Sequence, residues 1–577
     1  MVNVKNLFGM AVMATALVGC SSNDNLAPDG KDNAGKPGEA YASFKINLPT
    51  TTGNGTRGDA DPASTPLGTP SFENGDKNEY AVKDATLLLF QKVGSDFKFK
   101  EVVDLGNMEP WTPSSTSGIT TTAKLTAKIT KAEVGADKGY YALIVLNNNS
   151  GTAAKISYPT EGQTYADWSQ NEANATANYL KYDNGFFMAN APKYVAGAPE
   201  TLVEIKNIYA SKQQAENATA TTVYVERGLA KVSLASTSAE HVDITEGNYN
   251  GDKVDITGWT LDVTNTKTYP VHVTDGLWAD IWKTTTTSAA DNGATMDRFH
   301  DTKLTEFPRV YWGLDPNYST AFTTVDACEK EFTMAKKTDF KTGDEAKKAQ
   351  YCLENTFDIA HMMQGQTTRV LFSAKYTPKN FTDGETFYKI GNSSKLWHAT
   401  EVEAQIKAKA QEVLNEADAD KVTVTLAAEG NDMTKSGVYL VAAANITYGT
   451  TALEPEQVDQ INAKLGLKKA TAKDAAVGLS TFESGVSYYI ARVKHFNELT
   501  PWAPGNKTYD GNNANWLGRY GVLRNNWYEL SVSSVSGPGY PDIPKVNPTD
   551  PDDENEQFIN VEVKILSWAK RSQSIDL

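Results

Sequence analysis

The stretch YASFKINLP, residues 41–49, alternates apolar and polar side chains. Phe44, Ile46 and Leu48 fall on one face of an extended chain, because successive side chains of a strand point to opposite sides. Polar runs rich in small residues, Gly and Pro flank the stretch on both sides. A lone strand is not stable in water, so we expect this one to pair, half-buried, with a sheet built from later parts of the chain.

The end of the chain contains a second alternating stretch. Its apolar positions are Ile559, Val561, Val563 and Ile565, and polar side chains lie between them. Residues 545–557, just before it, are rich in Pro, Asp and Glu, which predicts a solvated linker. The chain is therefore expected to carry one isolated strand near each end, each tethered by loose chain.

Between these ends, from Tyr80 onward, runs rich in Val, Ile, Thr and Tyr recur, with Gly, Asn or Pro near their ends. Their irregular spacing predicts an all-β fold, as a sandwich or several β domains, and not a propeller. Two stretches, residues 401–421 and 454–467, are instead typical of surface helices inserted between strands. The aromatic side chains between residues 516 and 528 leave two interpretations open: core packing, which we favour, or a sugar-binding platform.

The composition and the motifs limit the classes of function. The chain of 577 residues has 55 basic and 71 acidic side chains and a net charge of −16. Nucleic acid is not expected as a partner, because phosphate contacts need clustered Lys and Arg. No HExxH, GxSxG, P-loop or GxGxxG motif occurs, and the six histidines are scattered. We therefore expect no cofactor, no metal and no enzyme, with an enzyme built from distant loops as a disfavoured alternative.

The N-terminus has the pattern of an export signal. Lys5 precedes an apolar run over residues 7–18, which is too short to span a membrane as a helix. The run leads into Leu-Val-Gly-Cys, residues 17–20, which resembles the lipobox of bacterial lipoproteins. That resemblance implies a signal peptide over residues 1–19 and a diacylglycerol group on Cys20. The alternative is an ordinary signal peptide followed by a chance cysteine.

The two other cysteines, Cys328 and Cys352, lie near each other in the sequence. No CxxC motif or paired Cys/His spacing accompanies them, so a structural zinc site is not expected. In an exported protein they either form a disulfide that contributes about 3 kcal/mol or remain unpaired thiols in an insertion. Both alternatives stay open.

Residues 57–59 read Arg-Gly-Asp within a polar run of small side chains. Such a run is suited to proteolytic nicking, and the tripeptide arises by chance often enough to need no function. We therefore favour cleavage between Arg57 and Gly58 over display of an adhesion tripeptide. The two exclude each other in one molecule, because the cut separates Arg57 from the residues that follow.

The order of these stretches resembles that of the Bacteroidales fimbrillins, nearest to the shaft subunits of minor fimbriae. The resemblance spans most of the chain, and no single motif is decisive. The region of Cys328 and Cys352 and the 401–421 helix look like insertions. Besides the lipobox, the segments that carry the resemblance are YASFKINLP, TTVYVERGLAKVSLA (221–235), RVLFSAKYTPK (369–379), GVLRNNWYELSVSSV (521–535) and VEVKILSWAKRSQSIDL (561–577).

The resemblance implies two transthyretin-like β-sandwich domains with Greek-key-type connections and inserted helices. The implied divisions of the chain are a signal peptide (1–19), a propeptide (20–57) with a removable strand (41–48), an N-terminal domain (58–226), a C-terminal domain (227–544) and an acidic linker with a donor strand (545–577).

The resemblance also implies an assembly route at the outer membrane. The lipid-anchored precursor reaches the cell surface, a protease cuts after Arg57, and the first strand leaves with its anchors Phe44, Ile46 and Leu48. The four apolar residues of another subunit's C-terminal strand then fill the vacated groove. The implied product is a fimbria that supports adhesion and biofilm formation, and the implied partners are further copies of the chain and accessory tip and anchor subunits. No ligand on host or bacterial surfaces is indicated.

Two other hypotheses stay open. The chain could be a monomeric lipoprotein, anchored in the outer membrane, that binds glycan or host protein. It could also be a tip or anchor subunit of the same kind of fimbria. A tip subunit is expected to lack a free donor strand or to carry an additional binding domain.

Overall fold

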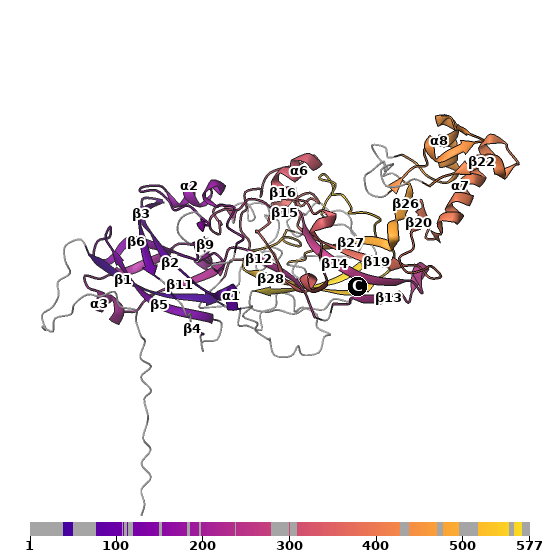
Figure 1. The fold of residues 1–577 in the computed structure, drawn as a ribbon. Coiled ribbons are helices and arrows are strands. Elements are labelled where there is room, and N and C mark those ends of the chain that lie inside the picture. Colours follow the sequence, from indigo (N-terminus) through magenta and orange to yellow (C-terminus); the bar gives the residue numbers. More distant parts are fainter. Residues whose placement is uncertain are drawn as a thin grey trace, which may run out of the picture.

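The computed structural model is elongated, with two strand-rich regions in a row and a helical lobe at the far end of the second (Figure 1). Three sites expected from the sequence, Cys20, Arg57 and Gly58, lie outside the described residues. The structure describes residues 39–49, 77–106, 108, 112–113, 119–148, 153–181, 185–195, 198–236, 238–277, 299, 309–426, 438–469, 477–495, 517–552 and 559–567.

The N-terminal region is a nine-stranded sheet whose two halves pack against each other. Its order is β3-β2-β6-β7-β11-β1-β5-β4, with β10 paired to β6. The sheet turns at β11, where residues 221–224 pair with β1 and residues 225–227 pair with β7. Apolar side chains of both halves meet in one core. The strands are β1 (Ala40–Pro49), β2 (Ala85–Val93), β3 (Asp96–Gly106), β4 (Thr112–Pro113), β5 (Ile119–Ile129), β6 (Gly135–Leu146), β7 (Met188–Asn190), β10 (Val203–Ile208) and β11 (Thr221–Arg227).

The C-terminal region is a second sandwich. One sheet has the order β18-β12-β28-β29, and the other has the order β13-β14-β19-β27, with β17 paired to β14. The inner faces share a core that includes the buried side chains of Trp259, Phe372, Tyr489 and Tyr528. The strands are β12 (Ala230–Leu234), β13 (His241–Asp243), β14 (Lys253–Asp262), β17 (Lys341–Thr342), β18 (Gln350–Cys352), β19 (Arg369–Thr377), β27 (Val486–Arg492), β28 (Asn526–Val535) and β29 (Ile559–Ser567).

The inserted helices belong to a lobe with its own core, which projects beyond the second sandwich (Figure 1). Helix α7 (Ala399–Leu414) presents Val402, Ile406 and Ala410 at a spacing of four residues, and these buried side chains face the lobe core together with residues of α8 (Pro455–Lys464). The helix ends at Asn415, which adopts a left-handed conformation with φ 51°. The strands of the lobe are β20 (Phe387–Ile390), β21 (Leu396–Trp397), β22 (Val422–Val424), β23 (Val438–Tyr439), β24 (Ile446–Tyr448), β25 (Thr451–Ala452) and β26 (Leu479–Phe482).

The prediction of an all-β fold of sandwich type with inserted helices is confirmed. The lobe goes beyond that prediction, because the two stretches read as separate surface helices pack together with short strands into a third core. Within the described residues, no helix is both long and apolar enough to cross a membrane. The short elements are α1 (Lys77–Tyr80), α2 (Tyr165–Ser169), α3 (Lys212–Asn217), α6 (Val325–Glu331), β8 (Lys193–Val195), β9 (Ala198–Glu200), β15 (Thr264–Asn265) and β16 (Phe332–Thr333).

Of the two alternatives for Cys328 and Cys352, the structure has the unpaired thiols. Cys328 and Cys352 are both free and buried. Cys328 lies in α6 and packs with a small cluster that includes Phe332, whereas Cys352 ends β18 and packs into the main core of the second sandwich. Burial raises the pKa of the Cys328 thiol to about 11 and that of Cys352 to about 12. The two thiols belong to separate clusters, which corrects the disulfide alternative.

The prediction of a solvated linker over residues 545–557 is wrong for residues 545–552. Val546 is buried and packs in the same small cluster as Cys328. Asp552 is fully buried, and its carboxylate accepts a hydrogen bond of 2.7 Å from the Thr367 hydroxyl. A carboxylate can be buried when hydrogen-bond donors replace water, so the acidic composition alone was a poor guide to exposure. Residues 553–558 lie outside the described residues.

Candidate functional site

Strand β1 is an inner strand of the first sandwich. Along its whole length it pairs antiparallel with β5, for example Phe44 with Leu125, and over residues 44–47 it also pairs parallel with β11. Its N-terminal end is fixed further by two hydrogen bonds of 2.8 Å between the backbones of Tyr41 and Tyr209. Loss of β1 would therefore leave backbone donors and acceptors unpaired on β5 and β11, which is a template for another strand.

The apolar face of β1 is part of the core. Phe44, Ile46 and Leu48 have exposures of 0%, and Ala40 and Ala42 of 1%. These five positions alternate along the strand and belong to the cluster between the two halves of the sheet. Each large anchor contributes about 1.5–3 kcal/mol if it is fully buried. The three predicted anchors thus lie together in one buried cluster; their removal stays a prediction.

The other face of β1 is polar and mostly covered. The hydroxyls of Ser43 and Thr126 form a hydrogen bond of 2.8 Å, and the Thr122 hydroxyl donates to the Asn47 side-chain oxygen over 2.7 Å. Lys45, between them, is exposed. In the register with β5, Lys45 lies directly opposite Lys124. The polar face of β1 thus has one exposed position, Lys45, between the two buried polar positions Ser43 and Asn47.

Strand β29, which contains the four predicted donor anchors, lies at the edge of its sheet. It pairs antiparallel with β28, with Val561 opposite Val532 and Val563 opposite Leu530. Within the described part of the chain, β28 is the strand it pairs with. The side chains of residues 559–567 are outside the described residues, so their place as anchors stays a prediction.

The chain just before β29 is fixed to the second sandwich. The Gln364 backbone N–H donates to the Asp550 carbonyl over 2.9 Å, and its side-chain oxygen accepts from the Asn547 backbone over 3.0 Å. The Asp552 backbone N–H donates to the Met362 carbonyl over 3.1 Å, beside the bond from Thr367. We call residues 545–552 the root of β29. The root therefore ends at Asp552, and residues 553–558, which separate it from β29, lie outside the described residues.

Helix α1 is fixed to both sandwiches. Glu79 in α1, the first described helix after Arg57, lies 2.7 Å from the Lys231 ammonium and accepts a 2.6 Å hydrogen bond from the Tyr351 hydroxyl. The Arg227 guanidinium donates to the Glu79 carbonyl over 2.7 Å. Burial opposes ionisation of Glu79, but Lys231 and Tyr351 outweigh it and hold its pKa below the usual value. The partners come from β11, β12 and β18, so α1 joins the two sandwiches.

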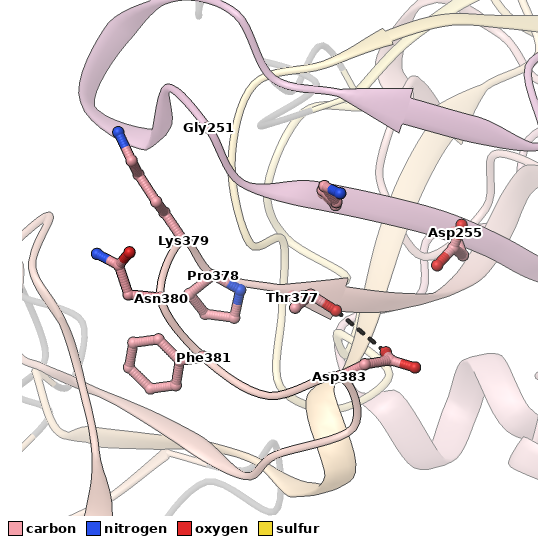
Figure 2. Close-up of a pocket in the computed structure, with 9 residues that line it drawn as sticks. Gly251, Asp255, Thr377, Pro378, Lys379, Asn380, Phe381 and Asp383 are labelled. Atoms are coloured by element: carbon pink, nitrogen blue, oxygen red, sulfur yellow. Dashed lines mark hydrogen bonds between the residues drawn. The ribbon is translucent and has the colours of Figure 1, made fainter.

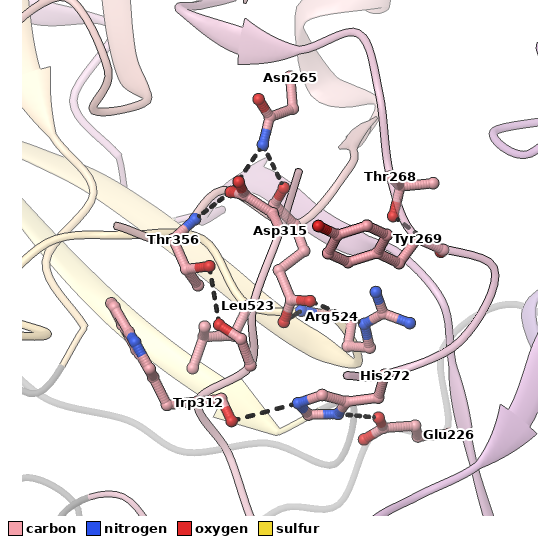
Figure 3. Close-up of polar contacts among 12 residues, drawn as sticks. Glu226, Asn265, Thr268, Tyr269, His272, Trp312, Asp315, Thr356, Leu523 and Arg524 are labelled. Carbon is pink, nitrogen blue, oxygen red and sulfur yellow. Dashed lines mark hydrogen bonds and ion pairs between the residues drawn. The ribbon is translucent and has the colours of Figure 1, made fainter. Parts of the chain in front are cut away.

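A buried polar network continues this junction (Figure 3). Glu226 of β11 lies 2.5 Å from the His272 ring and 3.4 Å from Arg309, and Arg524 pairs with Glu354 over 3.0 Å. Burial raises the pKa of Glu226, but His272 and Arg309 lower it more. A histidine beside a carboxylate is a common catalytic pair. Here His272 and Glu226 are only 1% and 2% exposed, so the pair is closed to solvent and holds the two sandwiches together.

Asp315 is part of the same network. Its carboxylate accepts hydrogen bonds from the Thr356 and Asn317 backbones and the Asn265 side chain, at 2.6, 2.7 and 2.9 Å (Figure 3). Burial nevertheless raises its pKa to about 7. It is enclosed by its partners, which favours a structural role.

A surface cavity of about 430 Å³ lies where β14 begins and β19 ends (Figure 2). Both carboxylates in its lining have partners: Asp383 accepts from Lys375 over 2.7 Å and from Thr377 over 3.2 Å, and Asp255 lies 2.6 Å from His241. Phe381, on its wall, stacks on His398 at 3.7 Å between ring centroids. The carboxylates of the lining are thus engaged in local pairs, which favours a structural role for them. The lining residues are Gly251, Lys253, Asp255, Thr377, Pro378, Lys379, Asn380, Phe381 and Asp383.

The aromatic stretch near residue 520 is core. Tyr520, Trp527 and Tyr528 are 3%, 8% and 0% exposed. The Trp527 indole donates to the Ser233 hydroxyl over 2.7 Å, and the Lys231 ammonium lies 3.8 Å from the centre of a Trp527 ring. These three side chains therefore do not offer a sugar-binding platform, and Trp516 is outside the described residues. No group of three or more His, Cys, Asp or Glu that could hold a metal occurs within the described ranges.

Sequence reasoning missed the buried carboxylates that fix helix α1 and the root of β29. Glu79 lies in a short polar stretch without a motif, and Asp552 lies in an acidic run that looks solvated. Both are buried carboxylates whose partners lie far away in the sequence, such as Lys231 and Thr367. No local pattern carries such a contact.

Comparison with known proteins is most informative for the C-terminal part. Residues 480–574 match the family model described as the C-terminal domain of fimbrillin, major fimbrial subunit protein type IV. No curated relative matches the sequence. Among solved structures, a fimbrilin from Porphyromonas gingivalis W83 shares 11% identity, with 92% of this chain and 99% of that chain covered and a TM-score of 0.34. A fimbrial assembly protein from Parabacteroides distasonis shares 12% identity, with 62% and 92% covered and a TM-score of 0.21.

The matched range contains β27, β28 and β29, that is, the edge of the second sandwich where the C-terminal strand docks. Residues 480–574 are therefore similar to the C-terminal domain of fimbrillins.

Proposed function

We propose that this chain is a structural subunit of a cell-surface fimbria that polymerises by strand exchange. The precursor is a lipoprotein held at the outer membrane through Cys20. Cleavage between Arg57 and Gly58 frees β1, and the C-terminal strand of a second copy fills the groove. The match of residues 480–574 to fimbrillins supports the fimbrial part of the proposal.

The observation that carries strand exchange is the inner position of β1. A strand with partners on both sides and three fully buried anchors leaves a long open groove when it departs. The C-terminal strand offers four apolar residues at the same spacing of two. An added strand can then supply both the backbone hydrogen bonds and the side chains that the groove has lost. Contacts of this head-to-tail kind do not close on themselves and give filaments.

Deletion of residues 558–577 tests the proposal. The shortened chain should be exported, lipidated and cleaved, yet remain monomeric on the cell surface. Polymers isolated from cells with the complete chain should begin at Gly58. Polymers of the shortened chain, or polymers that begin at a lipidated Cys20, would contradict the exchange.

A second candidate is an accessory subunit at the tip of the fimbria. The observation that favours it is the lobe between β20 and β26, which has a core of its own and projects from the end of the molecule (Figure 1). Immunogold labelling with an antibody against residues 399–464 distinguishes the two. Labels along the whole fimbria support a shaft subunit, as in minor fimbriae, and labels at the ends alone support a tip subunit.

A further inference from the structure

We infer that the C-terminal strand of a second copy enters the β1 groove in one register, with Glu562 at the place of Lys45. Val561, Val563 and Ile565 then take the places of Phe44, Ile46 and Leu48. The inference rests on the strand exchange proposed above and adds which residues of the two copies face each other.

The direction of the incoming strand follows from its neighbours. β5 pairs with β1 antiparallel from residue 40 to residue 49, whereas β11 pairs parallel over residues 44–47 only. Antiparallel ladders are slightly more stable per residue than parallel ones. A strand that runs in the direction of β1 keeps the antiparallel ladder along the longer neighbour.

The charge at the exposed position selects the register. In the precursor Lys45 lies opposite Lys124, and like charges directly opposite each other destabilise a strand pair. The Lys124 ammonium is turned to the Glu216 carbonyl, to which it donates over 2.7 Å. Glu562 at the place of Lys45 replaces a repulsive pair with an attractive one, so the groove prefers the incoming strand at this position.

Registers shifted by two residues fit the groove worse. A shift in one direction moves Glu562 to the place of Ser43, which is 4% exposed, and sets Lys564 opposite Lys124. The other direction moves Glu562 to the place of Asn47, which is 1% exposed, and carries Ile565 past the end of β1. Both bury a carboxylate that has no basic residue opposite it. A shift by one residue turns the apolar face outward.

The inferred register also fits the apolar volume. Its outermost anchor, Ile559, takes the place of Ala42, and Val561 takes that of Phe44. Isoleucine in place of Ala42 adds nearly as many carbon atoms as valine in place of Phe44 removes. Exchanges that conserve the total volume are tolerated best. Lys564 falls at the place of Asn47, which is 1% exposed. A lysine fits this place better than a glutamate, because its longer stem can carry the charge past the nearby end of the strand to solvent.

Disulfide cross-linking between introduced cysteine pairs tests the register of the incoming strand against β5 directly. Purified precursor with Glu562→Cys and Lys124→Cys is cleaved after Arg57 with an arginine-specific protease, polymerised and oxidised. The matched controls carry Glu562→Cys with Thr122→Cys or Thr126→Cys, which face the places of Asn47 and Ser43. Ser531→Cys with Glu562→Cys reports docking of β29 on its own chain. We expect a ladder of covalent oligomers from the Lys124 pair and at least about tenfold less from the controls, because a disulfide tolerates little change in Cα separation.

The outcomes separate the register from the exchange itself. A ladder from the Thr122 or Thr126 pair instead overturns the register and leaves strand exchange standing. Polymers that form without any ladder, and that also form after deletion of residues 558–577, overturn both. A charge swap adds a second readout: Lys124→Glu should slow polymerisation about threefold, and Lys124→Glu with Glu562→Lys should restore it.

Discussion

Strands β1 and β29 have the same alternating pattern but opposite places in the fold. β1 is held on both sides, by β5 and β11, and its large apolar side chains are fully buried. β29 lies at the end of its sheet and pairs with β28. An inner strand leaves only if the sheet opens, whereas an edge strand leaves by breaking one ladder.

This difference explains why the two strands need different handling in the proposed exchange. A strand that is covalently continuous with the rest of the domain returns to its groove faster than a second copy can enter it, because its effective concentration is high. Cleavage after Arg57 removes that advantage from β1. β29 needs no cut, because only its own edge contact has to be given up.

Buried carboxylates fix two segments of the chain, helix α1 and the root of β29. Glu79, downstream of β1, pairs with Lys231, and Asp552, upstream of β29, accepts from Thr367. We therefore expect removal of β1 to leave α1 in place at Glu79. We expect release of β29 to leave the chain up to Asp552 in place. The following changes test these differences.

The largest effect is expected from the core of β1. Phe44→Ala in the uncleaved chain should lower the free energy of unfolding of the first sandwich by about 3–5 kcal/mol, because it leaves a cavity at a fully buried site. Urea unfolding followed by hydrogen exchange in β5 measures it. Val93→Ala, at a residue 48% exposed, is the control and should change stability by less than about 0.5 kcal/mol. Equal effects of the two would show that β1 is not a core strand.

Loss of β29 should destabilise the protein less than the change in the core of β1. Deletion of residues 553–577 removes one edge ladder and leaves the order β18-β12-β28 of the sheet intact. Hydrogen exchange should rise in β28, while that in β5 and β6 should stay unchanged. Faster exchange throughout the first sandwich would contradict the separation of the two regions.

The next largest effect is expected from the ion pair between Glu79 and Lys231. Lys231→Met leaves a buried carboxylate without its ammonium partner, which should cost about 3 kcal/mol. The pKa of Glu79 is lowered in the folded chain, so its contribution to stability is present above the ordinary value of 4.5 and is lost as the pH falls. The variant should therefore lose stability at pH 7 and differ less from the parent near pH 4. A constant difference across this range would mean that Lys231 acts through packing on Trp527 instead.

The root of β29 should give a smaller effect. Thr367→Val removes the hydroxyl that donates to the buried Asp552 carboxylate and should cost about 1–3 kcal/mol locally. Hydrogen exchange over residues 545–552 should rise, with little change elsewhere. Asp550→Asn, at an exposed side chain in the same segment, is the control. Unchanged exchange in the Thr367 variant would show that other contacts hold the root.

The sequence was sufficient for features that depend on local alternation. The period of two at Phe44, Ile46 and Leu48 predicted a half-buried strand, and the apolar face is buried as expected. The polar face is more covered than predicted, because Ser43 and Asn47 are 4% and 1% exposed. The stretches 401–421 and 454–467 predicted helices, and α7 and α8 lie there, although α7 ends early at Asn415. Such patterns are readable because the burial of a face repeats with the geometry of the element.

Features that depend on distant partners could not be read in the same way. Asp552 is followed by further acidic residues and looks solvated, but it is buried and hydrogen-bonded to Thr367 and Met362. Cys328 and Cys352 are near in sequence and pack in different clusters. The lobe core requires α7 and α8 to meet, and nothing in either helix alone specifies the other.

The smallest expected effect concerns the exposed position of β1. Lys45→Glu replaces a like-charged pair with Lys124 by an opposite one and should stabilise β1 in the precursor by about 0.5 kcal/mol. The gain should shrink in high salt, because the pair is exposed. After cleavage, the same change should slow the exchange of β1 for the incoming strand, because it removes the charge advantage that Glu562 has over Lys45. Polymerisation rates of Lys45→Glu and of the uncharged control Lys45→Gln, each at low and high salt, measure it. If the two variants polymerise equally fast at low salt, the charge at this position does not guide the exchange.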